Sequence, residues 1–334
     1  MDDFRVSVII PVFNAREYVG QAIESALCQP ETAEVIVVDD GSVDGSFDEC
    51  LTYAKRYRQV KVLHHPDHKN HGAAASRNLG IRQASTPFVA FLDADDYYLA
   101  DRFRTARELL VSLPDADGVY EAIGTHFEDQ KSRELWSRVP LPILTTVYEY
   151  IEPEQLFAKL LRGGCGYFSF DGVVVRKGVF DRVGYFNESL RMFEDTEMMY
   201  KLAALCHLYP GSIEQPVAIR RVHHNNRITH HLCDSRATYN SLVLLWNSLQ
   251  DWGLHSLTRH QRFLLSRRHV ERLRKIDYIE DATCAELIVA RKAMLKIACS
   301  SPKLFATLWF WRIMIPSSQF FKNKVYKRSA LDRR

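Results

Sequence analysis

Residues 34–42 read EVIVVDDGS, an apolar run that ends in two carboxylates, a glycine and a serine. The run over 34–38 predicts a buried β-strand, because β-branched side chains pack well on a pleated surface and no turn residue interrupts them. Two other runs have the same form, VSVIIPV at residues 6–12 and PFVAFLDADD at residues 87–96. Each predicted strand is followed directly by polar residues, so candidate chemistry lies where the strands end.

Helical spacing fills the stretches between these strands. Apolar residues at positions 19, 22, 23, 26 and 27 fall at helix intervals, and Asn14 with Glu17 favours a capping box at the start of that helix. A short strand is predicted over 60–63, and further helices over about 44–58, 72–84 and 99–112. This alternation predicts an α/β fold with a Rossmann-like, mostly parallel sheet and helices on both of its faces.

The pattern changes after about residue 117. Short strands are predicted over 118–123, 172–175 and 216–220, and helices near 153–162 and 194–207. From about residue 234 the pattern is helical, over 237–252, 258–276, 281–299 and 302–314. We therefore expect one α/β domain over residues 1–233, with halves at about 1–125 and 126–233, followed by a basic helical C-terminal region over 234–334.

Composition and cysteine usage narrow the class of protein. Of 334 residues, 46% are hydrophobic and 25% charged, values typical of a globular protein with a sizeable core. The seven cysteines form no Cys-x-x-Cys pair, which favours a reducing cytoplasm over a disulfide framework or a zinc ribbon. The first residues lack the pattern of a signal peptide, and no run reaches the ~18 apolar residues of a membrane-spanning helix.

The charges are unevenly distributed along the chain. Residues 254–334 hold 18 Lys and Arg but 6 Asp and Glu, whereas residues 1–253 hold 26 and 35. An acidic body with a basic end is typical of a chain whose end meets an anionic partner, such as a membrane surface or a nucleic acid. A solvated helical face explains the same charges, and the sequence leaves both interpretations open.

Carboxylates follow two of the predicted strands. In the turn at residues 93–95 (Asp-Ala-Asp), two carboxylates can converge, and their hard oxygens suit Mg²⁺ or Mn²⁺. A polar turn with Asp96 as a helix cap explains these residues equally. After the other strand, Asp39 and Asp40 can accept hydrogen bonds from a base or ribose, although a turn and a helix cap again need no ligand.

Three further segments carry candidate chemistry. Residues 70–78 (NHGAAASRN) are small enough for a ligand to approach the backbone, and Arg77 can reach a base or phosphate. Glu194 and Asp195 open a predicted helix, where a carboxylate is either a general base or a favourable partner of the helix dipole. His223 is either a metal or phosphate contact or a structural histidine.

Six segments in this order closely resemble the family 2 glycosyltransferases with the GT-A fold. They are VSVIIPVFNAREYVGQAIESAL, EVIVVDDGSVDGS, GAAASRNLGI, FVAFLDADD, GYFNESLRMFED and RRVHHNN. The resemblance covers about residues 5–230 and leaves the C-terminal helices outside it. The chain has neither a Gly-Lys-Ser/Thr phosphate loop nor a Gly-x-Gly-x-x-Gly after its first strand, which disfavours P-loop and dinucleotide-binding proteins.

The resemblance implies transfer of a sugar from a nucleotide diphosphate-sugar to an acceptor hydroxyl with inversion, helped by Mn²⁺ or Mg²⁺. It implies Asp195 as the catalytic base. The residues that it places around the donor are Pro11, Val12, Phe13, Asn14, Asp39, Asp40, Ala73, Arg77, Asp93, Ala94 and Glu194. The residues that it places on the metal are Asp93, Asp95 and His223.

The resemblance also implies partners. A UDP-sugar is the favoured donor, and a glycan or lipid-linked glycan is the expected acceptor, in glycan or polysaccharide biosynthesis. No nucleic acid is expected. Apolar and aromatic bulk beside a basic end predicts either peripheral contact with the cytoplasmic membrane face through residues 302–334 or packing on the protein itself. Two alternatives remain, an inactive nucleotide-sugar-binding protein and a sugar-nucleotide pyrophosphorylase.

Overall fold

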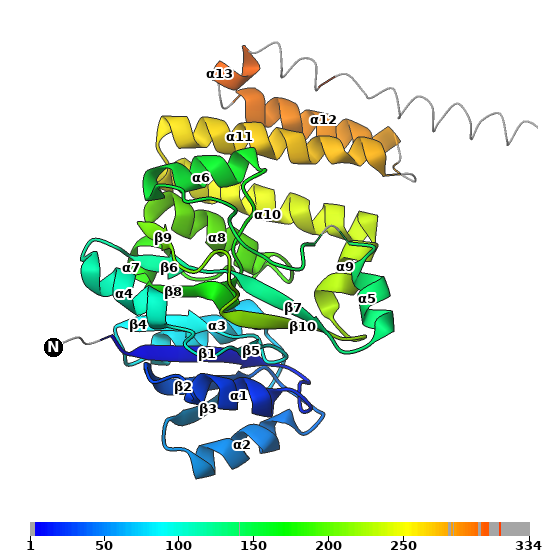
Figure 1. The fold of residues 1–334 in the computed structure, drawn as a ribbon. Coiled ribbons are helices and arrows are strands. Elements are labelled where there is room, and N and C mark those ends of the chain that lie inside the picture. Colours follow the sequence, from blue (N-terminus) through cyan, green and yellow to red (C-terminus); the bar gives the residue numbers. More distant parts are fainter. Residues whose placement is uncertain are drawn as a thin grey trace, which may run out of the picture. The chain divides into compact units, whose positions relative to one another are not determined.

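The computed structural model describes residues 4–139, 141–279, 282, 284–299, 302–306 and 314. The chain falls into two compact units, residues 1–229 and residues 230–334. Figure 1 shows the strands gathered in the first unit and the long helices of the second.

The first unit is built on a seven-stranded sheet with the strand order β3-β2-β1-β4-β8-β6-β9. Its strands are β1 (Val6–Val12), β2 (Thr32–Asp39), β3 (Val60–His64), β4 (Phe88–Phe91), β6 (Gly118–Tyr120), β8 (Val173–Arg176) and β9 (Leu208–Pro210). The first four run parallel, whereas β8 is antiparallel to both of its neighbours. The predicted mostly parallel sheet is confirmed, and β8 adds the antiparallel pairs of its second half.

A second, three-stranded sheet begins immediately after the turn at residues 93–96. It consists of β5 (Tyr97–Tyr98), β10 (Ala218–Val222) and β7 (Ile123–Phe127), with β10 in the centre. Because Ala218 pairs with Tyr98, the end of β10 is held beside that turn. This pairing brings His223 to the Asp-Ala-Asp residues across more than a hundred positions of sequence.

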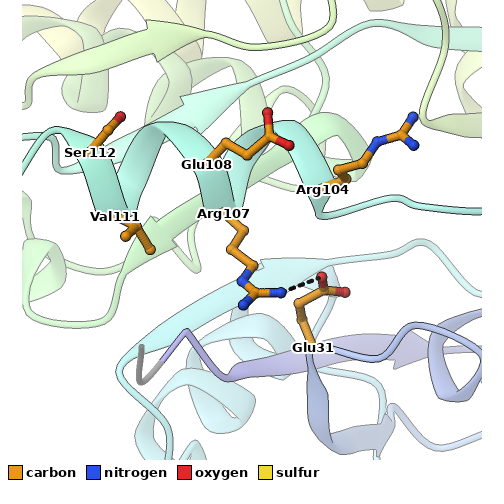
Figure 2. A pocket seen from close by; sticks show the side chains of 6 residues that line it. All are labelled: Glu31, Arg104, Arg107, Glu108, Val111 and Ser112. Atoms are coloured by element: carbon orange, nitrogen blue, oxygen red, sulfur yellow. Dashed lines mark ion pairs between the residues drawn. The ribbon is translucent and has the colours of Figure 1, made fainter. Parts of the chain in front are cut away.

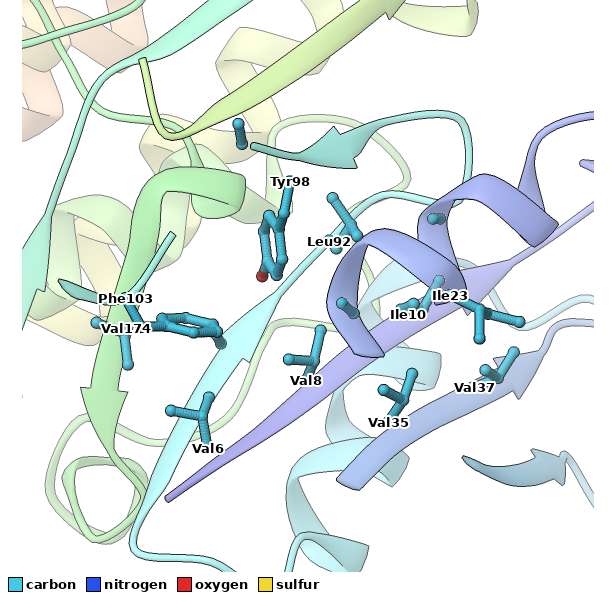
Figure 3. Close-up of a cluster of buried hydrophobic side chains, with 14 of the residues drawn as sticks. Val6, Val8, Ile10, Ile23, Val35, Val37, Leu92, Tyr98, Phe103 and Val174 are labelled. Carbon is cyan, nitrogen blue, oxygen red and sulfur yellow. The ribbon is translucent and has the colours of Figure 1, made fainter. Parts of the chain in front are cut away.

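Helices cover both faces of the main sheet. The helices of this unit are α1 (Val19–Leu27), α2 (Ser46–Arg56), α3 (Ala73–Gln83), α4 (Arg104–Ser112), α5 (Gln130–Trp136), α6 (Pro153–Arg162), α7 (Val179–Val183) and α8 (Glu194–Leu205), with a 3₁₀ turn, η1, at Phe170–Gly172. Helix α5 packs on β7 and β10 of the second sheet. On β1, Val8 and Ile10 join a buried cluster with Ile23 of α1 (Figure 3). Ile9 points the other way, toward Gly80 of α3. Alternate side chains of β1 therefore pack against helices on opposite faces of the sheet.

The start of α1 differs from the prediction. The helix begins at Val19, and its cap residue Tyr18 makes no side-chain cap bond, so the predicted capping box is wrong. Asn14 instead lies in the left-handed region, with φ of 51°, and its Oδ1 accepts a hydrogen bond from the N–H of Val43. A long-range contact has replaced a local one, and it ties the loop after β1 to the loop after β2.

The second unit is helical. Helix α9 (Arg227–Cys233) leads into α10 (Ser235–Ser256), α11 (Arg259–Leu273), the 3₁₀ turn η2 (Arg274–Tyr278), α12 (Cys284–Cys299) and α13 (Pro302–Phe305). Thr258 and Gln261 form a capping box at the start of α11. The predicted C-terminal helices are confirmed, although most of the helix predicted over 302–314 lies outside the described residues. Within the described residues, no helix combines the length and apolarity needed to cross a membrane.

Candidate active site

A cleft of about 540 Å³ opens where β1, β2 and β4 end. The predicted site residues that line it are Pro11, Val12, Phe13, Asn14, Asp40, Ala73, Arg77, Asp93, Ala94, Asp95 and His223. Asp39, Glu194 and Asp195 are the predicted residues outside this lining. The other residues of the lining are Ala15, Tyr18, Asn70, Asp96, Arg220, Asn225, Asn226, Arg227 and Ile228.

A second hollow, of about 390 Å³, lies over the outer side of α4 (Figure 2). Arg107 of α4 faces Glu31 across it at 4.0 Å. None of the predicted site residues lines this hollow. The cleft at the strand ends, where α/β sheets ordinarily bind ligands, is therefore the candidate active site.

The two aspartates after β2 have different tasks. Asp40 accepts hydrogen bonds from the N–H groups of His71 and Gly72, at 2.7 and 2.8 Å, and so fixes the loop that leads into α3. Asp39 uses Oδ2 to accept from the N–H groups of the turn that follows it. Its other oxygen, Oδ1, is buried and lacks a hydrogen-bond partner among the described residues. A buried acceptor without a donor is uncommon in a native protein.

The loop after β1 presents an aromatic ring to the cleft. Phe13 is 49% exposed, although a large apolar side chain gains free energy from burial. The neighbouring Asn14 keeps the loop in place, because its N–H donates to Ser42 Oγ at 3.0 Å and its Oδ1 accepts from Val43 at 2.9 Å. Phe13 is therefore a fixed apolar surface at the cleft, open to a planar ligand.

Arg77 connects three segments beneath the cleft. It is buried, and its guanidinium donates to Asp93 at 2.7 Å and to Glu194 at 2.9 Å. Burial alone would lower the pKa of Arg77, but the charges of Asp93, Glu194 and Asp195 outweigh burial and raise it. The predicted contact of Arg77 with a base or phosphate stays a prediction, since this guanidinium is already shared between two carboxylates.

Asp195 lies in the first turn of α8, beside the buried Glu194. Its Oδ1 accepts hydrogen bonds only from Thr196, and no cation of the described residues forms an ion pair with it. The residue before this pair, Phe193, has a φ of 65°, which is strained for an aromatic residue. The Asp195 charge acts on Arg77 and on Tyr167, so the carboxylate lies near the cleft without lining it.

The aspartates after β4 point to different partners. Asp93 binds Arg77, whereas Asp95 Oδ2 lies 3.1 Å from His223 Nε2 and 3.2 Å from Asn226 Nδ2. Asp96 is buried and accepts from the N–H of Arg221 at 2.7 Å, so it is not the helix cap that the sequence allowed. Asp93 thus binds an arginine, Asp95 a histidine, and Asp96 the backbone of the second sheet.

A buried carboxyl pair lies under this turn. Asp171 accepts from the N–H of Asp93 at 3.0 Å and is hydrogen-bonded to Asp96. Burial raises the pKa of both Asp96 and Asp171, and the neighbouring carboxylates raise both pKa values further. Oxygens of Asp93, Asp96 and Asp171 lie within 4.8 Å of one another, an acidic cluster that could hold a cation. The sequence carries no signal for Asp171, because it follows an ordinary apolar stretch.

Arg221 and Arg220 are neighbours in β10, but only Arg220 lines the cleft. Arg221 donates to the carbonyl of Asp95 at 2.9 Å and lies over the rings of Tyr18 and Tyr97. Arg220 lines the cleft and donates to Thr145 Oγ1 at 3.1 Å, without an ion pair among the described residues. Arg221 therefore fixes the turn, whereas Arg220 is a positive charge directed to the cleft.

Comparison with known proteins identifies the family. A family model described as glycosyl transferase family 2 matches residues 7–184, which is just over half of the chain, and the chain belongs to this family. An uncharacterized glycosyltransferase of Rickettsia felis is 41% identical over 103 residues, 30% of this chain and 16% of that protein. Succinoglycan biosynthesis protein ExoU of Rhizobium meliloti is 28% identical over 204 residues, 60% of this chain and 57% of that protein. The chain thus spans less than two thirds of the length of these relatives.

Solved structures have the same fold at low sequence identity. S. aureus TarS 1-349 in complex with UDP-GlcNAc has a TM-score of 0.67 and 19% identity, covering 97% of this chain and 92% of that one. The mannosyltransferase PcManGT of Pyrobaculum calidifontis, in complex with GDP-Man and Mn²⁺, has a TM-score of 0.53 and 16% identity over 96% and 86%. The predicted GT-A fold with C-terminal helices is confirmed.

Proposed function

We propose that this protein is a metal-dependent, inverting glycosyltransferase that uses a nucleotide diphosphate-sugar, with a UDP-sugar as the favoured donor. The observation that carries the proposal is the convergence of Phe13, Asp40, Asp95 and His223 on one cleft. The proposed catalytic domain is residues 1–233. A UDP-sugar is the donor that the family resemblance favours, and a solved structure of the same fold, TarS 1-349, holds UDP-GlcNAc.

The proposed nucleoside site lies between the loops after β1 and β2. Phe13 offers an exposed aromatic face for the base or ribose, in a loop that Asn14 holds in place. Asp39 Oδ1 is an acceptor that lacks a donor, and a nucleobase N–H is a donor of the kind it lacks. Asp40 supports the site indirectly, since both of its oxygens bind the loop before α3.

The donor set fits Mn²⁺ or Mg²⁺. Asp95 Oδ2 and His223 Nε2 lie 3.1 Å apart at the cleft, Asp93 lies in the same turn, and carboxylate oxygens are the ligands that these ions prefer. We propose these three residues as the ligands rather than the deeper cluster of Asp93, Asp96 and Asp171, because Asp96 and Asp171 already bind each other. A bound divalent cation would offset the negative charge that develops on the departing diphosphate.

Asp195 is the proposed general base. It would take the proton of the acceptor hydroxyl while that oxygen attacks the anomeric carbon and the bond to the diphosphate breaks, which inverts the centre. Its freedom from ion pairs supports this role, because a carboxylate held by an arginine is a weaker base. Arg220 would help to neutralise the departing diphosphate, since it lines the cleft and forms no ion pair with any described residue.

For the acceptor and the cellular location, we propose only a class of molecule and a compartment. The likeness to ExoU supports a glycan or lipid-linked glycan acceptor in polysaccharide biosynthesis. Six cysteines of the described residues are all free thiols, which supports a reducing cytoplasm. The predicted membrane contact through residues 302–334 falls mainly outside the described residues and stays a prediction.

The substitution Asp195→Asn tests the proposed chemistry. We expect a folded protein that still binds nucleotide and whose transfer rate falls by about 10²–10⁴, the usual contribution of a general base. The measurement is UDP release from UDP-sugars, with free and lipid-linked glycans offered as acceptors. Asp181→Asn, an exposed carboxylate of α7, is the matched control and should retain the wild-type rate.

Two outcomes would contradict the assignment. Wild-type transfer by Asp195→Asn would remove Asp195 as the base. Tight nucleotide-sugar binding by the wild-type protein without turnover on any acceptor would favour the alternative of an inactive binding protein, for which the position of Asp195 outside the cleft lining is the supporting observation.

A further inference from the structure

Helix α12 of the second unit has two apolar sides. Its inner side packs into the core of that unit, where α11 and η2 meet it. The buried residues of this inner side are Leu287, Ala290, Met294, Ile297 and Ala298. A surface helix of a globular protein ordinarily has a polar side opposite such a face.

The opposite side of α12, here called the outer stripe, is apolar and basic instead. Its exposed residues are Ile288, Val289, Lys292, Leu295, Lys296 and Cys299. They fall at i, i+1, i+4, i+7, i+8 and i+11, which places all of them along one side of the helix. Ile288 is 55% exposed, Val289 66% and Leu295 38%. Large aliphatic side chains in a contiguous exposed row mark an interaction surface more often than an ordinary solvent face.

The charge of the outer stripe identifies its kind of partner. Lys292 and Lys296 lie within the apolar row, and the stripe itself contains no acidic residue. Glu286 is the only carboxylate of the helix, and it pairs with Arg236 at 2.6 Å. The complementary surface is therefore apolar and negatively charged at once.

We propose that the outer stripe binds the surface of an anionic lipid bilayer. Aliphatic side chains can enter the acyl boundary while lysines extend their ammonium groups to lipid phosphates, which satisfies both properties of the stripe. The excess of Lys and Arg over residues 254–334 acts in the same direction. This surface goes beyond the proposed transfer reaction and does not depend on it.

A second copy of the chain fits the outer stripe less well. A symmetric helix pair would bring the same surface from both copies together. Lys292 and Lys296 of each copy would then face lysines of the other across an apolar contact, with no carboxylate on either stripe to pair with them. Like charges placed opposite each other disfavour association. An anionic membrane has no such conflict.

Vesicle flotation of the full-length protein tests the proposal. Vesicles of phosphatidylcholine alone are compared with vesicles that also contain phosphatidylglycerol, at low and high salt, without nucleotide. We expect the wild type to bind the anionic vesicles and to release them at high salt. The double variants I288E/V289E and K292E/K296E should each bind at least about tenfold more weakly. The matched control L244E/L254E changes two exposed leucines of α10 and should bind like the wild type.

Every other outcome overturns the proposal. Absence of wild-type binding to anionic vesicles, or equal binding by all variants, would remove the lipid partner. If I288E/V289E dissociates a wild-type dimer seen by sedimentation velocity in the absence of lipid, the occupant is a second copy. If that variant has a markedly lower melting temperature than L244E/L254E, the chain itself covers the stripe. Nucleotide binding by the same variants reports on the transferase site separately.

Discussion

Asn226 connects two of the side chains to which we assign the metal. Its Oδ1 accepts from the N–H of His223, and its Nδ2 donates to Asp95 Oδ2 and to the carbonyl of Arg221, both at 3.2 Å. One amide therefore sets both the turn that carries the imidazole and the direction of the carboxylate. Partners of this kind around a metal ligand ordinarily matter nearly as much as the ligand.

We expect Asn226→Ala to weaken Mn²⁺ binding by about 10–100-fold while the protein remains folded. The measurement is the concentration of free Mn²⁺ by electron paramagnetic resonance during titration. Asn225→Ala is the matched control, because the contact of Asn225 with His223 is made by its backbone N–H. Equal Mn²⁺ affinities of the wild type and Asn226→Ala would show that this amide does not position the ligands.

The order of the six segments along the chain predicted more of the candidate site residues than any single motif did. Asp93, Asp95 and His223 line one cleft, because the pairing of β10 with β5 brings the end of β10 to the turn after β4. The contacts of Asp171 and Arg221 with the turn at residues 93–96 were not predicted, since they span 78 and 126 positions and depend on the second half of the fold. Arg77 was expected at the ligand, but two carboxylates already engage it.

At the scale of the element, the contact of α3 with β1 sets the distance between two elements that border the cleft. Gly80 has no side chain, and a Cβ placed there would lie 2.4 Å from Ile9 Cγ2. Small residues in α3 therefore serve close packing on the sheet, which is the structural alternative that the sequence left open for residues 70–78. Ala73 at the start of the helix lines the cleft, and the approach of a ligand to this segment stays a prediction.

We expect Gly80→Ala to lower the free energy of unfolding by about 1–3 kcal/mol, because overpacking exceeds the helix propensity that alanine gains. The measurement is urea unfolding followed by circular dichroism. Gly178→Ala is the control, since no atom lies within 4 Å of its added Cβ and its φ of −61° suits alanine. A Gly80→Ala protein as stable as the wild type would show that β1 can yield at this contact.

At the scale of the whole molecule, Glu34 ties the sheet of the first unit together. This buried carboxylate of β2 accepts from Ser7 of β1 at 2.6 Å, from the N–H of Ser85 at 2.6 Å and from Lys61 of β3. Burial alone would raise the pKa of Glu34, but these hydrogen bonds outweigh burial and lower it to about 2. The folded protein therefore prefers the ionised form more strongly than the unfolded chain does.

Acid should weaken the first unit through this group. A depressed pKa contributes stability that is fully present above the unfolded pKa of about 4.5 and is lost as the pH falls toward about 2. We expect Glu34→Gln to be less stable at pH 7 and to lose less stability than the wild type between pH 5 and pH 2. The measurement is urea unfolding across that range. Parallel pH profiles for the two proteins would exclude Glu34 as a source of the acid sensitivity.

A nucleotide that binds the proposed site together with a metal stabilises the folded protein, so its binding can be followed by the melting temperature. The protein is heated with UDP, GDP, dTDP or CDP, each in the presence of Mn²⁺, Mg²⁺ or EDTA. A nucleotide at a hundred times its dissociation constant adds ~2.7 kcal/mol to the stability. We expect UDP with metal to raise the melting temperature, and we expect the rise to disappear with EDTA and in Asp95→Ala. No rise with any nucleotide under any of these conditions would contradict it.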